Sequence, residues 1–240
     1  MPGIHVLPLE GIPEIEQGDD LAALLGEAAG WTGGFQSNDV LVVAQKAVSK
    51  ADGRVVRLED VEPSEAAREL AGDQDPRYLE VILGEASRVV RSRPPLVIAE
   101  THHGFVCASA GVDASNTPGT DTLVLLPVDP DASARRLHER LGVAVIVSDS
   151  FGRPFRQGTT DVAIGVAGLT PLLDLRGKRD RTGYELRSTQ IAVADEIAGA
   201  AELVMGKTDG IPAAIVRGLE LAGDGSARDL VMPADRDLFR

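Results

Sequence analysis

The chain has 240 residues, of which 43% are hydrophobic and 3% aromatic, and its formal net charge is −13. This length allows a substantial core in one large domain or two small ones, and the composition is that of a globular protein. The negative charge argues against a general nucleic-acid binder, and the scarcity of aromatic residues argues against a platform that stacks bases. An acidic protein can still bind phosphates if it recruits divalent cations and places a few basic side chains locally.

The sequence has none of the usual features of secretion or membrane insertion. No apolar run approaches the roughly 18 residues of a membrane span. The N-terminal segment lacks the basic start and long apolar stretch of a signal peptide. Cys107 is the only cysteine, so no internal disulfide can form. These features predict a cytoplasmic protein without a membrane partner.

The first half of the chain is predicted to mix strands and helices. A strand is expected at 4–9, and a helix at 21–30 that Asp19 or Asp20 would cap. Residues 39–50 begin as a strand of β-branched residues and end in polar residues. Further helices are expected at 64–71 and 76–87, followed by extended segments at 88–92, 96–101, 104–111 and 122–128.

The second half follows a similar mixture. Its expected elements are an amphipathic helix at 129–142, strands at 143–149 and 160–169, a helix at 188–206, a strand at 212–221 and a peripheral acidic tail. Because strands and helices do not alternate strictly, the order favours an α+β fold over a regular doubly wound sheet. No repeat or low-complexity linker divides the chain, so we expect one domain over 1–240, with room for two lobes.

Two of the predicted strands end in similar polar groups. Residues 106–112 lead to Asp113 and Asn116, and residues 143–147 lead to Asp149 and Ser150. Mg²⁺ and Mn²⁺ prefer oxygen ligands, usually one or two carboxylates with water and substrate phosphates. If the two strands lie side by side, they predict a divalent metal site. Alternatively, the aspartates only form Asx turns or cap helices.

The loop GRPFRQG at 152–158 places Arg153 and Arg156 shortly after Asp149. Arginine suits a bidentate grip on phosphate or carboxylate, so the loop is a candidate anion site next to the metal. The alternative is an ordinary solvated basic loop.

Two lysines and a glycine-rich turn are further candidates. Lys46 and Lys50 are expected to point the same way from an extended segment, toward a nucleotide or toward water. Segment 206–210, GKTDG, is predicted to be a turn that can face a ligand. It is not a P-loop, because Ala201 stands where that motif needs its first glycine.

Several longer motifs together resemble the coenzyme F420-0:L-glutamate ligase family. They are LPLEGIPEIEQGDDL, DVLVVAQKAVSKADGR, AGVDASN, LLPVDPDASA, SDSFGRPFRQG, VADEIAGAAELVMGK and IPAAIVRG. Their order and spacing cover nearly the whole chain. Two positions depart from the pattern: Gln45 stands where relatives often have Ser, and Asp149-Ser150 stands where they often have Asp-Thr. The second change keeps the hydroxyl group. Some relatives carry a fused C-terminal nitroreductase-like domain, which we do not expect here.

The resemblance implies mixed sheets with helices in an intertwined homodimer. It also implies a GTP-dependent ligase that adds L-glutamate to a deazaflavin coenzyme precursor. The implied metal is Mg or Mn, held by Asp113, Asp149 and Ser150, with room for a monovalent cation. The residues implied to contact GTP are Ile12, Pro13, Glu14, Ile15, Gln45, Lys50 and Asn116.

For the reaction, we hypothesise that GTP phosphorylates a carboxylate of the precursor, and that the amine of glutamate attacks the resulting acyl phosphate. Arg153 and Arg156 are the candidate catalytic residues, because they could hold the phosphodiester, the acceptor carboxylate or the transition state. Two alternatives remain open. One is a metal-dependent nucleotide hydrolase or phosphotransferase, and the other is a catalytically silent protein that binds a nucleotide or F420.

Overall fold

The computed structural model describes residues 3–238 and centres on a five-stranded sheet. Its strands, in spatial order, are β1 (His5–Pro8), β12 (Ala213–Arg217), β2 (Val40–Ala44), β8 (Ala144–Gly152) and β9 (Thr159–Ala167). β2 and β8 run parallel, whereas the other neighbouring pairs are antiparallel. β2, β12 and the first part of β8, up to Ser148, are apolar and almost entirely buried, as expected for strands covered on both faces.

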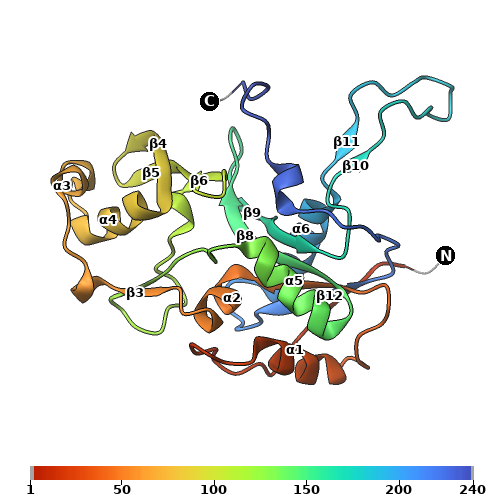
Figure 1. Cartoon of the computed structure of the whole chain (residues 1–240), viewed down its shortest axis with the longest axis horizontal. Helices are drawn as coiled ribbons and strands as arrows, with labels where there is room; N and C mark the ends of the chain where they lie inside the picture. Colours follow the sequence, from red (N-terminus) through yellow and green to blue (C-terminus); the bar gives the residue numbers. More distant parts are fainter. Residues whose placement is uncertain (1–2, 239–240) are drawn as a thin grey trace.

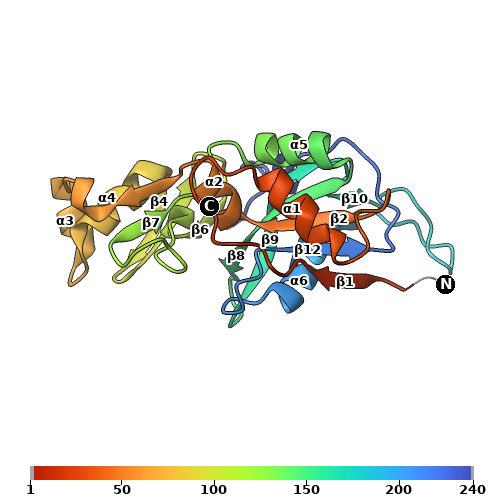
Figure 2. The same ribbon diagram turned by 90° about the horizontal axis from the view of Figure 1, so that it is seen from below.

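Helices cover both faces of this sheet (Figure 2). α1 (Leu21–Gly30) and α5 (Pro130–Leu141) lie on one face, and α6 (Val193–Met205) lies on the other. Each face has its own hydrophobic cluster. Leu25 and Leu137 belong to the cluster of Val145 on the first face. Ile197 and Ala201 belong to the cluster of Ile146 on the second face.

The helices start and stop where their side chains satisfy the backbone. The Asp20 carboxylate accepts a hydrogen bond from the amide of Ala23 at 3.1 Å, which caps α1. α5 has Asp129 as its N-cap, accepting from the amide of Ala132, and a proline in its first turn. It ends at Gly142, whose φ of 72° is the left-handed conformation that glycine adopts without strain.

α5 lies unusually close to β9 at Gly165. A β-carbon at this position would stand 2.3 Å from the carbonyl oxygen of Pro130. The next residue of α5, Asp131, is buried and accepts hydrogen bonds from the amides of Val166 and Ala227. One carboxylate therefore ties the helix to the sheet and to the C-terminal 3₁₀ helix η3 (Ala227–Leu230), so the expectation of a wholly peripheral tail is wrong at Ala227.

A smaller group of elements lies to one side of the main sheet (Figure 1). Its members are β3 (Val55–Arg57), η1 (Leu58–Asp60), α3 (Glu65–Ala71), α4 (Pro76–Glu85), β4 (Ala86–Arg93), β5 (Leu96–Thr101), β6 (Val106–Ala108), η2 (Ser109–Gly111) and β7 (Thr122–Val124). We call this group the small lobe. It has a separate hydrophobic cluster, which includes Leu79, Ile82 and Val97.

A narrow arm projects from the body between β9 and α6 (Figure 1). It is built on two short antiparallel strands, β10 (Leu173–Asp174) and β11 (Gln190–Ile191). An isolated bridge between Arg179 and Glu185 continues the pairing toward its tip.

The expected α+β class is confirmed, but several boundaries were wrong. The strands expected at 122–128 and 212–221 end early, at Val124 and Arg217. Segment 39–50 is strand only to Ala44, because α2 (Gln45–Ala51) begins at the next residue. The helix expected at 76–87 ends at Glu85, and the one expected at 188–206 begins only at Val193. Among the helices within residues 3–238, none has the length and apolar character needed to cross a membrane.

Candidate active site

A cavity of about 260 Å³ opens at the carboxyl ends of the parallel strands β2 and β8. Such strand ends are the usual place for a ligand site in a sheet of this kind. Five parts of the chain line the cavity: the loop 12–15, the end of β2 with α2, Asn116, the end of β8 with Asp161 of β9, and the end of α6 with the segment that follows it to Pro212.

The end of β8 contributes a row of oxygen-bearing side chains. Ser148, Asp149 and Ser150 all line the cavity. Asp161 stands beside them on β9 and accepts hydrogen bonds from the Ser148 hydroxyl at 2.9 Å and the Ser150 hydroxyl at 2.6 Å. Ser148 and Asp161 are both buried, so these two bonds hold the serine hydroxyls in fixed orientations.

Asp149 is the most strongly perturbed carboxyl group of the site. Its pKa is raised to about 7, chiefly by burial and also by the nearby charges of Asp113 and Asp161, while the Ser150 amide and the charge of Lys46 act in the opposite direction. The shift shows that this carboxylate is short of positive charge in the protein alone. A cation bound beside it would reverse the effect.

Asp113 lies in a different environment, although the sequence pattern around it is similar. It follows η2 and pairs with Val124 through an isolated β-bridge. The Lys46 ammonium lies 2.6 Å from its Oδ2, and the amide of Ser115 donates to Oδ1 at 2.7 Å. Burial acts to raise the pKa of Asp113, but the bonds from Lys46 and Ser115 outweigh it and lower the pKa below its usual value.

α2 points three polar side chains at the cavity: Gln45, Lys46 and Lys50. Lys46 and Lys50 point the same way, as expected. The reason is that residues four apart on a helix share a face, and not that the segment is extended. Lys50 forms an ion pair with Glu14 of the loop 12–15. Gln45 is 1% exposed; its Oε1 accepts from Ser49, but its Nε2 is buried without a hydrogen-bond partner.

The turn after α6 closes the cavity opposite β8. Gly206, Lys207 and Thr208 line it, as expected for a turn that faces a ligand. The Asn116 amide donates to the carbonyl of Lys207 at 3.2 Å and thereby links this turn to the loop that carries Asp113. Asn116 itself has φ of 53°, a conformation in which Asn is one of the better tolerated residues.

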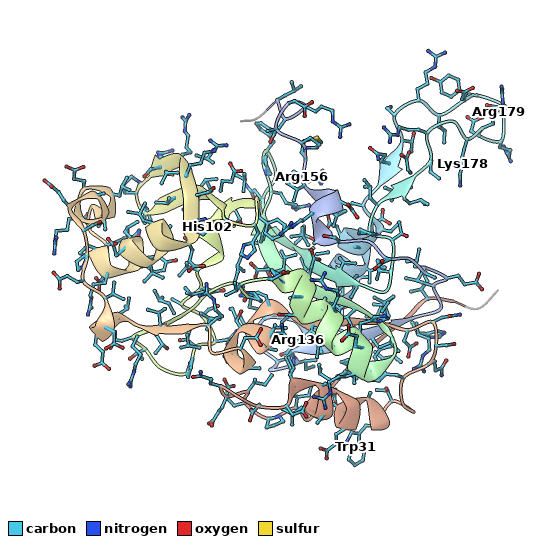
Figure 3. The ribbon with its side chains drawn as sticks, in the orientation of Figure 1. Trp31, His102, Arg136, Arg156, Lys178 and Arg179 are labelled. Carbon is cyan, nitrogen blue, oxygen red and sulfur yellow. The ribbon has the colours of Figure 1, made fainter. Side chains whose placement is uncertain are left out.

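Arg153 and Arg156 lie on the hairpin between β8 and β9, and neither is part of the cavity lining. Figure 3 labels Arg156. The Arg153 guanidinium donates to the carbonyl oxygens of Gln157 and Gly158 in its own loop. Both side chains are exposed, and Phe155 between them is 90% exposed. Their expected contact with an anion remains a prediction.

The arrangement fits a divalent metal held jointly with a ligand. Within residues 3–238, no group of three His, Cys, Asp or Glu side chains is placed to hold a metal alone. The protein therefore offers a partial oxygen site: Asp149, Ser150 and the nearby Asp113. Mg²⁺ and Mn²⁺ are commonly bound in this way, through one or two carboxylates and substrate phosphates.

Sequence reasoning found Asp113, Asp149 and Ser150 but missed three of their partners. Lys46 was considered only as one of two lysines facing a nucleotide or water, and Ser148 and Asp161 were not considered. The available signal for Asp161 was its position at the start of a strand expected to follow that of Asp149. Antiparallel pairing after a short loop would have placed the two carboxylates near each other.

The fold and the cavity define a class: an α+β protein whose polar site is formed by strand ends, lysines and acidic side chains. A sequence profile described as F420-0:Gamma-glutamyl ligase matches residues 11–218. The chain belongs to this family.

Individual relatives match over almost their full lengths. The Coenzyme F420:L-glutamate ligase of Methanothermobacter thermautotrophicus is 45% identical, over 99% of this chain and 99% of its own. The protein of the same name from Methanopyrus kandleri is 45% identical over 100% of both chains. That from Archaeoglobus fulgidus is 41% identical over 99% of this chain and 96% of its own.

Proposed function

We propose that this protein is a GTP-dependent ligase that joins L-glutamate to a carboxylate of a coenzyme F420 precursor. The observation that supports the proposal best is the cavity at the ends of β2 and β8. There, lysines for an anion adjoin a buried carboxylate that lacks positive charge. Family membership and relatives named Coenzyme F420:L-glutamate ligase support the choice of substrates.

The proposed reaction has two steps. A carboxylate oxygen of the precursor attacks the γ-phosphorus of GTP, the bond to the bridging oxygen breaks, and GDP leaves. The amine nitrogen of glutamate then attacks the carbonyl carbon of the acyl phosphate, loses a proton and expels inorganic phosphate. The phosphorylation is needed because a free carboxylate has no adequate leaving group.

The chain's own residues would bind and orient the reactants. A divalent metal, when bound, neutralises charge on the triphosphate; Asp113, Asp149 and Ser150 are the residues that would hold it. Lys50 and the loop 12–15 would contact the nucleotide, together with Asn116. A buried donor without an acceptor costs on the order of 1–3 kcal/mol. The unpaired Nε2 of Gln45 therefore supports a ligand acceptor at that point.

The hairpin arginines would act on the second substrate. Arg153 and Arg156 follow Asp149 on the same hairpin, so the phosphodiester or the acceptor carboxylate of the precursor could reach them while its reacting end lies near the metal. The exposure of both guanidinium groups leaves them available for such an anion.

We also propose that the protein acts as a cytoplasmic homodimer. The projecting arm supports this, because it exposes Tyr184 and Leu173 on a segment that has little contact with its own chain (Figure 1). Light scattering at micromolar concentration tests it: a particle of about 25.2 kDa would be a monomer and would contradict the dimer.

A set of omission assays tests the ligase. The protein is incubated with GTP, Mn²⁺, the precursor and glutamate, each component is omitted in turn, and products are identified by mass spectrometry. The ligase requires all four for a product heavier by one or more glutamyl units. GTP consumption without glutamate would indicate a hydrolase or phosphotransferase, and binding without turnover would indicate a silent binding protein.

A further inference from the structure

Lys46 contacts the Asp113 carboxylate, which is one of the proposed metal ligands. Asp113 has two carboxylate oxygens: Oδ1 accepts the amide of Ser115 at 2.7 Å, and the Lys46 ammonium lies 2.6 Å from Oδ2. The same ammonium donates to the Ser115 hydroxyl at 2.8 Å. Both carboxylate oxygens are therefore engaged before any ion arrives.

The ion pair is shielded from water. The side chains of Lys46 and Asp113 are 16% and 28% exposed, so the pair is less screened than an ordinary surface salt bridge. The charge of Lys46 also acts on Asp149, whose pKa it lowers against the larger effect of burial. Lys46 therefore pairs directly with Asp113 and acts on Asp149 only through its charge, which leaves the pKa of Asp149 raised.

Lys46 has another place to go within the same cavity. It lines the cavity from the first turn of α2, one helical turn before Lys50. Four rotatable bonds let a lysine ammonium swing by several ångströms. A triphosphate bound in the cavity would offer the displaced ammonium new anionic oxygens.

We infer that Lys46 is a positioning residue that holds the place of the divalent metal: it neutralises Asp113 in the empty protein, yields this carboxylate to the metal, and moves to the triphosphate. The inference rests on the proposed metal and nucleotide site.

The exchange makes metal and triphosphate binding interdependent. Without triphosphate, the metal must displace Lys46 and leave its charge without an anion, so metal binding is weak. With triphosphate present, the displaced ammonium gains a partner, so each ligand strengthens the binding of the other by the same factor.

Mn²⁺ titrations of the nucleotide-free protein test the inference, with calorimetry or the paramagnetic signal of free Mn²⁺ as readout. Lys46→Met removes the competing charge and keeps the chain length, so it should bind Mn²⁺ about tenfold more tightly than the parent. Tenfold corresponds to about 1.4 kcal/mol. Lys46→Arg keeps the charge and should bind Mn²⁺ close to the parental level.

Lys50→Met is the matched control. Lys50 lies on the same helix and lines the same cavity, but its partner is Glu14 and not a proposed metal ligand. This variant should leave Mn²⁺ affinity within about twofold of the parent. In the pair Lys46→Met and Asp113→Asn, the gain from the first change should disappear, because the contested carboxylate is gone.

A second titration uses inorganic tripolyphosphate as the probe. In the parent, tripolyphosphate should strengthen Mn²⁺ binding, and in Lys46→Met this strengthening should fall about tenfold beyond the effect of Mn²⁺–tripolyphosphate association measured without protein. Lys46→Met that binds Mn²⁺ no more tightly than the parent, or Lys50→Met that gains as much, would overturn the inference. A parent that binds no Mn²⁺ in either titration would instead overturn the proposed metal site itself.

Discussion

The end of β8 and the loop that follows η2 each carry an aspartate, and the two carboxylates differ in their surroundings: Asp149 lines the cavity, whereas Asp113 lies close enough to act on it by charge but is not part of the lining. Asp149 is on β8, just after an irregularity in its pairing with β9, and has a pKa raised to about 7, chiefly by desolvation. Asp113 lies on a loop, keeps 28% of its side chain exposed and is neutralised by Lys46. Similar sequence patterns thus yield one carboxylate that lacks positive charge and one that already has it.

The difference assigns the two carboxylates different parts in binding a cation. Asp149 provides the electrostatic demand, because its ionised form is costly until positive charge arrives. In the proposed metal site, Asp113 would provide a second oxygen ligand from the small-lobe side, and its ion pair with Lys46 would have to break. Each of the following experiments changes one side of this contrast.

Replacement of either aspartate by asparagine should have the largest effect. Asp149→Asn should weaken Mn²⁺ binding roughly 100-fold, since even changes outside the first coordination shell cost 10–100-fold. In chelator at pH 8 its melting temperature should rise, because an uncompensated buried charge is removed. Asp113→Asn should also weaken Mn²⁺ binding, but its melting temperature should fall by a few degrees because Lys46 loses its partner. Titration calorimetry measures Mn²⁺ binding, and scanning calorimetry measures the melting temperatures. If both variants shifted the melting temperature in the same direction, the predicted difference between the two carboxylates would be contradicted.

Asp161→Asn should weaken Mn²⁺ binding by about 10-fold, the lower end for a residue that orients ligands. Asp161 accepts from both Ser148 and Ser150, so its loss frees the Ser150 hydroxyl to rotate. Ser148→Ala is the matched control, because it removes one of these bonds and leaves Ser150 held. Titrations with Mn²⁺ compare the two variants. If Ser148→Ala weakened Mn²⁺ binding as much as Asp161→Asn does, the proposal that Asp161 acts by orienting the Ser150 hydroxyl would be contradicted.

The hairpin tip should respond in kinetics and not in stability. A charge-assisted contact with phosphate or carboxylate contributes on the order of 1.5–3 kcal/mol. Arg153→Ala and Arg156→Ala should each lower kcat/KM about tenfold or more. The corresponding lysine variants should recover part of this loss. Exposed loop charges change stability by less than about 0.5 kcal/mol, so melting temperatures should stay constant. Unchanged kinetics would assign these arginines to the scaffold.

The last effect is a pH dependence of stability in the metal-free protein. Folded Asp149 keeps its proton up to about pH 7, whereas an unfolded chain loses it near the usual 3.8. The folded state thus binds more protons between these values, and Asp149 makes the free energy of unfolding fall as pH rises through this window. Denaturant titrations from pH 4 to 8 should show a flatter profile for Asp149→Asn than for the parent. Equal slopes would show that Asp149 ionises normally.

The strand ends could be predicted from the sequence because their signal is local. An apolar run such as 143–147 followed by Asp149 and Ser150 marks both a buried strand and the point where it emerges. Parallel pairing of β2 with β8 then determines which other strand end adjoins it. The family resemblance added the loop 12–15 as a predicted nucleotide contact, and the structure places this loop in the cavity lining.

The partners of these residues could not be predicted, because they depend on contacts between distant segments. Lys46 meets Ser115 across 69 positions of the chain, and no periodicity records such a pairing. The start of α2 was missed for a local reason. Its N-cap is Ala44, which has no side-chain acceptor for the first amides, so the usual signal of a helix start is absent.

Gly165 also has a consequence for how this sequence can diversify. Its neighbour across the contact is the backbone of Pro130, which no rotamer change can move aside. A larger residue at 165 must shift α5, and with it the Asp131 carboxylate that holds Val166 and Ala227. A single substitution there would disturb three elements at once, so its effect depends on which residues already occupy α5. An evolutionary path to a larger side chain at 165 therefore has to begin with changes in the helix and not in the strand.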